Sequence, residues 1–362
     1  MKLSDRTILR MGIYQLGYMN SVPEYAAVNE SVVLAKRFAR GRESFINAVL
    51  RSYIKNKLTI QLPDRGKNEI EYLSIKYSYE PWIIELWLEQ YKMDFVEEML
   101  AAGNETPKMT IRINWLKTIK EDLIRRLEKM GYKVENGNLC ENALYVKKGR
   151  SLLDSKLYKH GMFSVQDEAS MLVSVMLDPK QGDTIMDLCA APGGKTFSIA
   201  ERMNNKGRII ASDIYKRKLG LIEAEAKRLG VNIVETRIWD ATKIDSTMAG
   251  KADKVLIDAP CSGLGVVRRK PEIKYKKRTL EFDILPRKQL SMLTAAATYV
   301  KPGGVLMYST CTINPHENQH VVAEFLKKNS DFVKEEAIQL LPNINDTDGF
   351  FICKMRRKDS LL

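Results

Sequence analysis

The sequence predicts an α/β fold with a mostly parallel sheet in residues 159–358, preceded by a small α+β subdomain and an all-α domain. From residue 163 on, short apolar β-type runs alternate with helical segments, which is the pattern of βαβ units. Near the N-terminus, apolar residues recur at helical spacing instead. The chain has 362 residues, 44% hydrophobic and 28% charged, which is enough for two or three packed domains.

The range 1–62 predicts a small helical domain. Apolar side chains at helical spacing mark three helices, with Pro23 and Gly41 between them, at 8–16, 27–38 and 45–54. A packing module without further function is an equally simple interpretation of this domain.

The range 68–158 predicts the α+β subdomain, after a polar linker at 62–67 that contains Pro and Gly. Its predicted elements are helices at 79–90 and 94–102, a strand at 109–114, a helix at 116–130 and a strand at 132–134. The segment is rich in Arg and Lys. It could bind RNA or cap the neighbouring domain, and the sequence leaves both open.

The strands of the large sheet are predicted within residues 159–358. They lie at 184–188, 208–213, 233–237, 254–258 and 304–309, with late segments at 337–341 and 349–354 closing the sheet. Ligands of open α/β sheets bind at the carboxyl ends of the strands. Residues that directly follow these strands are therefore the candidates for function.

A glycine-rich loop follows the first of these strands, with the sequence Asp-Leu-Cys-Ala-Ala-Pro-Gly-Gly-Lys-Thr at 187–196. Cys189 stands where a phosphate-binding P-loop needs its first glycine, and the Gly-x-Gly-x-x-Gly pattern of NAD sites is absent. Asp213 ends the next strand, where a carboxylate can accept both ribose hydroxyl hydrogens, and Asp240 follows the third. Unless these are ordinary loop acids, they suit an adenosyl group with a positive sulfonium and no phosphates, namely S-adenosylmethionine.

The composition of the chain indicates its cellular location and the kinds of partner that it binds. Nothing approaches 18 consecutive apolar residues and the charged N-terminus lacks a secretory segment, so we expect a cytoplasmic protein without a membrane span. Five cysteines without a Cys-x-x-Cys pair fit neither a disulfide framework nor a zinc site, so no metal is expected. The net charge of +13 favours a polyanionic partner, although basic solvated surfaces are also common.

Two further cysteines directly follow predicted strands, in Asp-Ala-Pro-Cys-Ser-Gly at 258–263 and Ser-Thr-Cys-Thr at 309–312. Together with the glycine-rich loop and Glu317-Asn318, these motifs resemble the RNA cytosine-C5 methyltransferases over residues 160–357. The resemblance implies a Rossmann-like class I S-adenosylmethionine-dependent methyltransferase domain.

Motifs in the helical domain, such as Phe-Ile-Asn-Ala-Val-Leu-Arg at 45–51, resemble the NusB-like domain of the RsmB (Sun/Fmu) branch. That branch methylates cytosine in small-subunit ribosomal RNA, so the resemblance implies 16S rRNA as the substrate. The chain begins inside the NusB-like domain and lacks its first helices, so a truncated domain is expected. We expect the protein to be a monomer.

The resemblance also assigns chemical roles. Cytosine C5 is a poor nucleophile, and a thiolate added at C6 creates an enamine whose C5 can attack a methyl group. By motif position, Cys311 is that nucleophile, Cys261 takes part in releasing the enzyme as base or proton relay, and Asp258 holds cytosine N3 or contacts the cofactor. The residues expected at the cofactor are Cys189, Ala190, Ala191, Pro192, Gly193, Gly194, Lys195, Asp213, Lys218, Asp240 and Asp258.

Flanking residues complete the predicted site. Thr312 and Lys218 replace the Ser and Arg of many relatives and keep a hydroxyl and a cation. The next helix is predicted to start at Asn314. Asn314 would be its N-cap, Pro315 its first-turn proline and Glu317 its capping-box acid.

A basic run with one aromatic residue occupies 268–278, directly after the first thiol. A charge run is usually a solvated face, but its place beside an active-site loop favours contact with RNA phosphates. The expected RNA-binding residues are Arg268, Arg269, Lys270 and Lys274. The target base must be unstacked to reach Cys311.

Three other functions compete with this hypothesis. A tRNA cytosine-C5 methyltransferase shares the catalytic residues, and the NusB-like start argues against it. A non-catalytic RNA-binding assembly factor would not need both thiols, Asp258 and the glycine-rich loop intact. A DNA cytosine methyltransferase attacks from its Pro-Cys loop, and a second Thr-Cys thiol is not part of that pattern.

Overall fold

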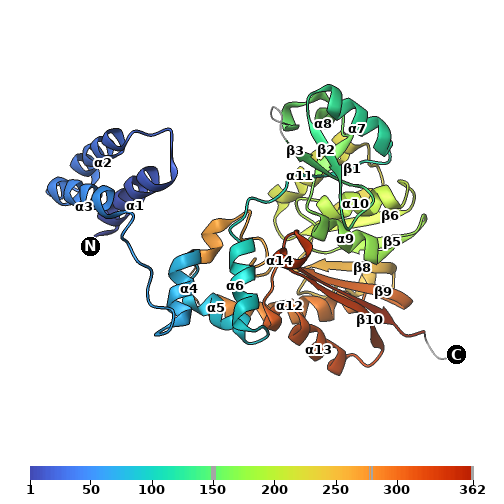
Figure 1. Ribbon diagram of the computed structural model, residues 1–362. Helices are drawn as coiled ribbons and strands as arrows, with labels where there is room; N and C mark the ends of the chain where they lie inside the picture. Colours follow the sequence, from blue (N-terminus) through green and yellow to red (C-terminus); the bar gives the residue numbers. More distant parts are fainter. Residues whose placement is uncertain (148–151, 277, 279, 360–362) are drawn as a thin grey trace. The chain divides into compact units, whose positions relative to one another are not determined.

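The computed structural model describes residues 1–147, 152–276, 278 and 280–359 (Figure 1). The chain divides into two compact units, Met1–Tyr72 and Leu73–Leu362. Across the described residues, no helix combines the length and the apolar character needed to cross a membrane.

The first unit is a bundle of three helices, as predicted. They are α1 (Leu3–Tyr18), α2 (Glu24–Phe38) and α3 (Glu43–Asn56), and their apolar faces meet in a common core that includes Leu9, Ala35 and Leu50. The helix α4 (Glu69–Tyr77) lies across the division between the units.

The second unit begins with α5 (Pro81–Leu88) and α6 (Met93–Ala102), close to their predicted positions. A four-stranded antiparallel sheet follows, in the order β2-β3-β1-β4. Its elements are β1 (Thr110–Ile113), α7 (Lys120–Lys129), β2 (Lys133–Asn136), β3 (Ala143–Lys147), α8 (Lys156–Lys159) and β4 (Phe163–Val165).

This small sheet contains two strands, β3 and β4, in addition to the two that the sequence predicts. The strand β4 lies inside the range predicted for the large domain, yet it pairs with β1. The helix α7 also begins later than expected, since Asn114 forms a turn instead: its side chain accepts from the Leu116 amide and donates to the Gly161 and Leu229 carbonyls.

The large sheet has seven strands in the order β10-β11-β9-β8-β5-β6-β7. The strands β7, β6, β5, β8 and β9 run parallel, and β11 and β10 add antiparallel pairs. The bounds are β5 (Thr184–Asp187), β6 (Arg208–Asp213), β7 (Val234–Ile238), β8 (Ala252–Asp258), β9 (Val300–Thr310), β10 (Phe332–Leu340) and β11 (Phe350–Arg357). All seven predicted strands are therefore present.

Helices cover both faces of the large sheet (Figure 1). The helices α9 (Glu168–Leu177), α10 (Gly194–Arg202) and α11 (Lys216–Leu229) pack on one face through residues such as Val173, Phe197 and Ile222. The helices α12 (Leu280–Ala297) and α13 (Gln319–Lys328) pack on the other through Leu293 and Phe325. A short helix, α14 (Pro342–Asn345), precedes β11. The result is the predicted three-layer α/β architecture.

Candidate active site

The two predicted catalytic thiols meet at the carboxyl edge of the large sheet. The strands β8 and β9 are parallel neighbours, with Asp258 opposite Ser309. The chain leaves both strands at the same edge, and the sulfur atoms of Cys261 and Cys311 lie 3.3 Å apart. The adjacent hydroxyl groups of Ser262 and Thr312 are 2.8 Å apart and bring the two loops together a second time.

The thiol pair is electrostatically asymmetric. The hydrogen bond from Cys261 lowers the pKa of Cys311 and outweighs the opposing effect of burial, and the cations Lys195 and Lys270 lower it further. The same hydrogen bond and burial raise the pKa of Cys261 well above its ordinary value. The pair therefore favours a thiolate at Cys311 and a protonated thiol at Cys261.

A charged pair lies beside the thiols. The ammonium of Lys195 on α10 is 2.7 Å from Oδ2 of Asp258, and both side chains are largely buried, at 10% and 30% exposed. The other carboxylate oxygen, Oδ1, accepts a hydrogen bond of 2.8 Å from the Ser309 hydroxyl. Ser309 was not predicted as a site residue, and the pairing of β8 with β9 places it opposite Asp258.

The Glu317 side chain connects the loop after β8, which carries Cys261, to the loop after β9, which carries Cys311. Its buried carboxylate accepts hydrogen bonds from the Ser262 backbone amide at 2.8 Å, the Gln289 side chain at 2.9 Å and the Asn314 side chain at 2.9 Å. The capping-box prediction for Glu317 is therefore wrong, because its carboxylate is engaged by the neighbouring loop. Asn314 caps only the short turn Pro315–Glu317, by accepting from the His316 amide.

Two glycines allow the loops to approach closely. At Gly265 a Cβ atom would lie 1.9 Å from the Gly349 carbonyl oxygen, so only glycine fits between the first cysteine loop and the loop before β11. Gly265 also donates from its amide to the Cys311 carbonyl oxygen, at 3.0 Å. These contacts hold the backbone of the two loops in place around the thiols.

The glycine-rich loop joins β5 to α10, as predicted. Gly193 is the N-cap of α10 and has φ +106°, a left-handed conformation that favours glycine. The Thr196 hydroxyl donates to Oδ2 of the buried Asp187, and burial raises the pKa of this carboxyl to about 7. The Ala190 amide donates to the Ser212 carbonyl at 2.8 Å, which ties the loop to β6. The Ala191–Pro192 peptide bond is cis.

Carboxylates of three strand ends converge on this loop. Burial raises the pKa of Cys189, and the negative charges of Asp187, Asp258 and Asp213 raise it further. Lys195 pairs with Asp258 and Lys218 pairs with Asp213, so cations balance two of these three carboxylates. The carboxylate at the end of β6 can accept the ribose hydroxyl hydrogens of an adenosyl group, and the residues present therefore fit the predicted cofactor.

Asp213 and Asp240 occupy different surroundings. Asp213 is buried at the end of β6, accepts from the Tyr215 amide and lies 3.3 Å from the Lys218 ammonium. Asp240 is more exposed and accepts two hydrogen bonds from Thr242, which lower its pKa. The structure thus brings Asp213 and Lys218 together, as predicted for the ribose end of the site, whereas Asp240 caps its own turn.

Two of the four cations predicted to bind RNA, Arg268 and Lys274, have buried side chains. Arg268 is buried at 2% exposure and pairs with Asp346 and Asp348, and Arg269 pairs with Asp348 and Asp167. Lys274 is buried as well and donates to the Asn104 side chain. These three cations hold neighbouring segments together. Lys270 is exposed, and its charge lowers the pKa of Cys311.

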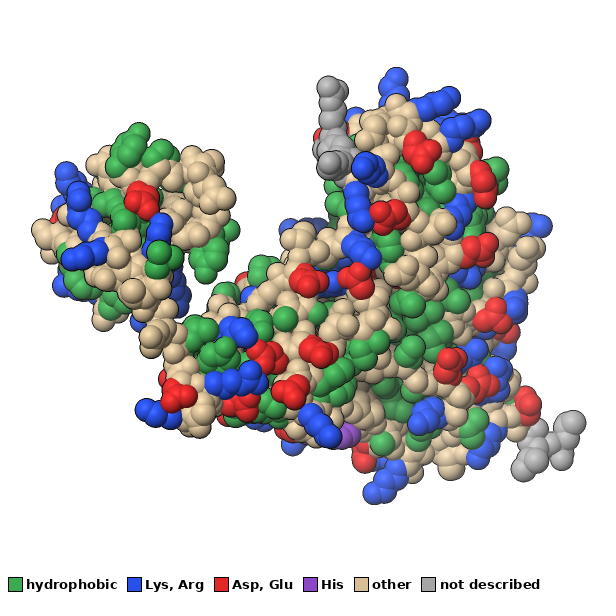
Figure 2. Space-filling model, in the orientation of Figure 1, with side chains coloured by type: hydrophobic (Ala, Val, Ile, Leu, Met, Phe, Trp, Pro, Cys, Tyr) green, Lys and Arg blue, Asp and Glu red, His purple; other side chains and the backbone are tan. Residues whose placement is uncertain are grey.

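The small subdomain has two different sides. Lys and Arg side chains gather on its outer surface (Figure 2). Arg125 and Arg126 of α7 have exposed side chains. On its inner side, the arginines Arg112 and Arg228 connect it to the large domain. The alternatives left open by the sequence, an RNA-binding module and a cap on its neighbour, are thus both compatible with its surface.

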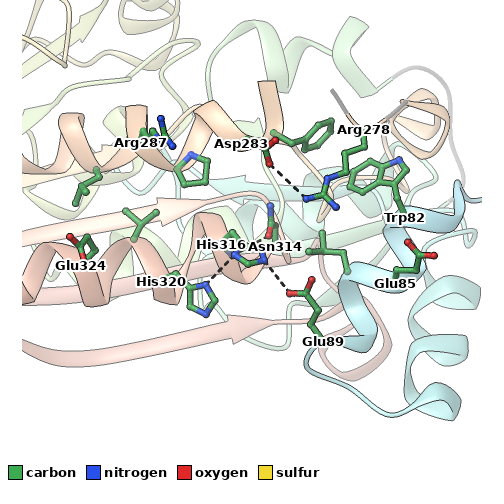
Figure 3. Close-up of a pocket in the computed structure, with 15 residues that line it drawn as sticks. Trp82, Glu85, Glu89, Arg278, Asp283, Arg287, Asn314, His316, His320 and Glu324 are labelled. Carbon is green, nitrogen blue, oxygen red and sulfur yellow. Dashed lines mark hydrogen bonds and ion pairs between the residues drawn. The ribbon is translucent and has the colours of Figure 1, made fainter. Parts of the chain in front are cut away.

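A cavity of about 530 Å³ lies behind the second cysteine loop, between α5, α12 and α13 (Figure 3). Trp82 and Phe282 form part of its wall, and His316 lies between Glu89 and His320. Asn314 is among its lining residues, whereas neither of the two thiols nor any residue predicted at the cofactor lines it. Among the described residues no group of three or more His, Cys, Asp or Glu side chains is arranged to hold a metal ion.

Comparison with known proteins agrees with this geometry. Models of three families match the chain: the NusB family at residues 1–55, the RsmF/B-like ferredoxin-like domain at 79–152 and the 16S rRNA methyltransferase RsmB/F at 174–356. The chain belongs to the 16S rRNA methyltransferase RsmB/F family. The resemblance and the fold class predicted from the motifs are confirmed, and the predicted domains at 1–62, 68–158 and 159–358 enclose the three matches.

Relatives match nearly the whole chain. A protein of Bacillus subtilis (strain 168) named probable ribosomal RNA small subunit methyltransferase B is 38% identical over 97% of this chain and 82% of its own length. A protein of the same name from Synechocystis is 32% identical over 97% of this chain and 83% of its own length.

Two solved structures have the same fold. The crystal structure of PH0851 has 31% identity and a TM-score of 0.82, covering 98% of this chain and 82% of that one. The structure of NSun6 from Pyrococcus horikoshii with SFG has 26% identity and a TM-score of 0.70, covering 76% of this chain and 98% of that one.

Proposed function

We propose that this RsmB/F family member methylates C5 of a cytosine in small-subunit ribosomal RNA, through a covalent adduct between Cys311 and C6 of the base. Its relatives in Bacillus subtilis and Synechocystis are named as probable methyltransferases of this RNA. The observation that carries the proposal is the 3.3 Å contact in which Cys261 lowers the pKa of Cys311. An rRNA substrate agrees with the predicted cytoplasmic location, and the monomeric state remains a prediction.

S-adenosylmethionine, when bound, supplies a methyl group on a positively charged sulfur. The residues that would hold it are those of the loop at 189–195, with Asp213 and Lys218 at the ribose end. The Asp213 carboxylate at the end of β6 supports an adenosyl cofactor, because it can accept both ribose hydroxyl hydrogens. A family structure at 26% identity is described with SFG, an analogue of this cofactor. Asp240 is a further predicted contact.

Cys311 and the Lys195–Asp258 pair carry out the first chemical step. The thiolate forms a bond to C6, and the electrons of the C5–C6 double bond shift through the ring to N3. A proton from the Lys195–Asp258 pair passes to N3, which neutralises the charge and leaves an enamine. Preorganised charged groups stabilise such developing charge effectively because they need no reorganisation.

Cys261 acts in the release of the product. After methylation, C5 carries both a methyl group and a hydrogen, and N3 returns its proton to the Lys195–Asp258 pair. The raised pKa of Cys261 keeps its side chain protonated, so this thiol is better suited to relay a proton than to act as a general base. Its sulfur takes the C5 proton while its own proton passes to the Cys311 sulfur. The C5–C6 double bond re-forms and the bond from Cys311 to C6 breaks.

Lys270 is the proposed RNA contact nearest to the thiols. It is exposed and its charge acts on Cys311, so it lies where the phosphates of an extruded nucleotide would pass. Arg268, Arg269 and Lys274, which were also expected to bind RNA, are proposed instead to shape the loops around the site, because their side chains are engaged within the protein.

Methyl transfer to defined RNAs tests this function. The full chain is incubated with methyl-labelled S-adenosylmethionine and with unmethylated 16S rRNA or with tRNA, and the product nucleotide is mapped. We expect 5-methylcytidine at one position of 16S rRNA. Label on tRNA alone would contradict the rRNA substrate, and no label on either RNA would favour a non-catalytic binding factor.

A further inference from the structure

Arg112 is a fully buried cation in a strand that holds none of the predicted site residues. It lies on β1 between Ile111 and Ile113, whose side chains pack into the core of the small subdomain. Successive side chains of a strand point to opposite faces, so Arg112 faces away from that core. It points towards α10, the helix that begins in the glycine-rich loop.

The guanidinium of Arg112 contacts both ends of α10. Its Nε and Nη2 donate to the two carboxylate oxygens of Glu201, at 3.0 and 2.8 Å. Its Nη1 donates to the Gly194 carbonyl oxygen at 2.7 Å and to the Gln166 side chain. One planar group therefore joins the small sheet to the first and the last turns of this helix.

Gly194 connects this contact to the chemistry. It is the first residue of α10, and it is followed by Lys195, whose ammonium bonds Asp258. A shift at the start of the helix would move both the glycine-rich loop and the Lys195–Asp258 pair. A buried ion pair contributes little net stability compared with apolar side chains of similar volume, so the ion pair itself does not account for the arginine. The hydrogen bond to Gly194 is what an apolar residue could not provide.

We propose that Arg112 is a positioning residue for the cofactor loop, through which the small subdomain holds the loop in its binding conformation. Holding a loop in place before binding removes part of the ordering cost that the ligand would otherwise bear. The inference rests on the proposed cofactor site and extends it to a subdomain with no predicted contact to the cofactor.

Arg228 provides a matched control. It is the second arginine that joins the small subdomain to the large domain: it lies on α11, pairs with Glu225, and donates to the Phe163 carbonyl and the Ser164 hydroxyl at 3.2 Å each. Among the described residues, the hydrogen-bond partners of its side chain lie outside the glycine-rich loop. If any connection between the subdomain and the large domain were sufficient, the two arginines would be equivalent.

The experiment replaces each ion pair as a unit, so that no buried charge is left unpaired. Arg112→Met with Glu201→Met is compared with Arg228→Met with Glu225→Met and with the wild-type chain. Affinity for S-adenosylmethionine is measured by titration calorimetry without RNA, and backbone amide exchange of residues 193–198 is measured in the cofactor-free protein. Thermal melting checks that each variant is folded.

We expect the Arg112 pair variant to bind S-adenosylmethionine about tenfold more weakly, the scale of one hydrogen bond from a charged donor. Amide exchange at 193–198 should be faster, with both quantities unchanged in the Arg228 pair variant. Equal affinity and exchange in a folded Arg112 pair variant would overturn the inference, as would equal losses in both variants.

A second variant covers the case in which the Arg112 pair variant does not fold. Arg112→Lys keeps a charge for Glu201, but one ammonium cannot reproduce the planar fork that bonds Glu201 and Gly194 together. We expect weakened cofactor binding with a retained melting transition, and unchanged binding would again overturn the inference. A wild-type chain that bound no S-adenosylmethionine would contradict the proposed function instead, so the two failures are distinguishable.

Discussion

The sulfur atoms of Cys261 and Cys311 lie 3.3 Å apart, although fifty positions separate the two residues in the chain. The parallel pairing of β8 with β9 brings them to one edge of the sheet, and Glu317 holds their loops together. The contact makes the two thiols chemically unequal, because the one that donates the hydrogen bond stabilises the thiolate of the other. Four predictions follow from these contacts and their surroundings.

The reactivity of Cys311 should depend on Cys261. Because the hydrogen bond from Cys261 is the largest cause of the lowered pKa of Cys311, Cys261→Ala should raise that pKa and move the onset of thiolate reactivity to higher pH. The rate of Cys311 alkylation by iodoacetamide, followed by peptide mass spectrometry from pH 5 to 10, measures the midpoint. Cys261→Ser keeps a donor and should give a smaller shift. A midpoint that falls or stays in place in Cys261→Ala would contradict the assigned direction.

Asp258→Asn should slow methylation by about 10² to 10³, the usual cost of losing one preorganised charged group at a reacting centre. The substitution removes the charge that holds Lys195 at 2.7 Å. Asp253→Asn is the matched control, because Asp253 lies on the same strand and bonds the Thr184 amide and Lys301 instead. Single-turnover methylation should be unaffected in the control, and equal slowing in both variants would show a general effect on β8.

Glu317→Gln should destabilise the protein by about 1–3 kcal/mol, because the amide group replaces one acceptor oxygen with a donor in a site where all the neighbours donate. Those neighbours are the Ser262 amide and the side chains of Gln289 and Asn314. Urea unfolding measures the change, and methylation should fall with it as the cysteine loops separate. Glu324→Gln, on the exposed side of α13, should change stability by no more than about 0.5 kcal/mol.

Lys270 and Arg268 should respond differently to alanine. Lys270→Ala should weaken RNA binding and reduce the slope of log affinity against log salt by about 1, the signature of one lost phosphate contact. Arg268→Ala should leave that slope unchanged and destabilise the fold by roughly 3 kcal/mol, because it leaves the buried Asp348 short of a partner. A reduced salt slope in folded Arg268→Ala would restore the original prediction for that residue.

Much of the fold and the site follows from local sequence patterns. The strands of the large sheet are apolar runs with clear boundaries, and parallel strands place their carboxyl ends at one edge, so Cys261, Cys311, Asp258 and the glycine-rich loop could be brought together by topology alone. Ser309 directly precedes the Thr-Cys motif, and the position of its hydroxyl beside Asp258 follows from the pairing of β8 with β9.

Other features depend on tertiary contacts that no local pattern encodes. Arg268 and Lys274 belong to a run whose composition predicts a basic surface. Their side chains are buried instead, and this burial depends on Asp348 and Asn104, which are distant in the sequence. Glu317 has the spacing of a capping box, but the Ser262 amide competes successfully for its carboxylate. Arg112 appeared as one of many cations in a basic segment, and only the packing of α10 on β1 shows that it is buried.

Identification of the cysteine joined to RNA tests the central claim most directly. The Cys261→Ala variant is incubated with S-adenosylmethionine and 16S rRNA, and the protein–RNA complex that resists denaturant is digested and sequenced by mass spectrometry. The account predicts that the complex accumulates, that the nucleotide is attached to Cys311, and that Cys311→Ala forms no complex. A stable complex formed by Cys311→Ala, with the nucleotide attached to Cys261, would contradict the assignment of the two thiols.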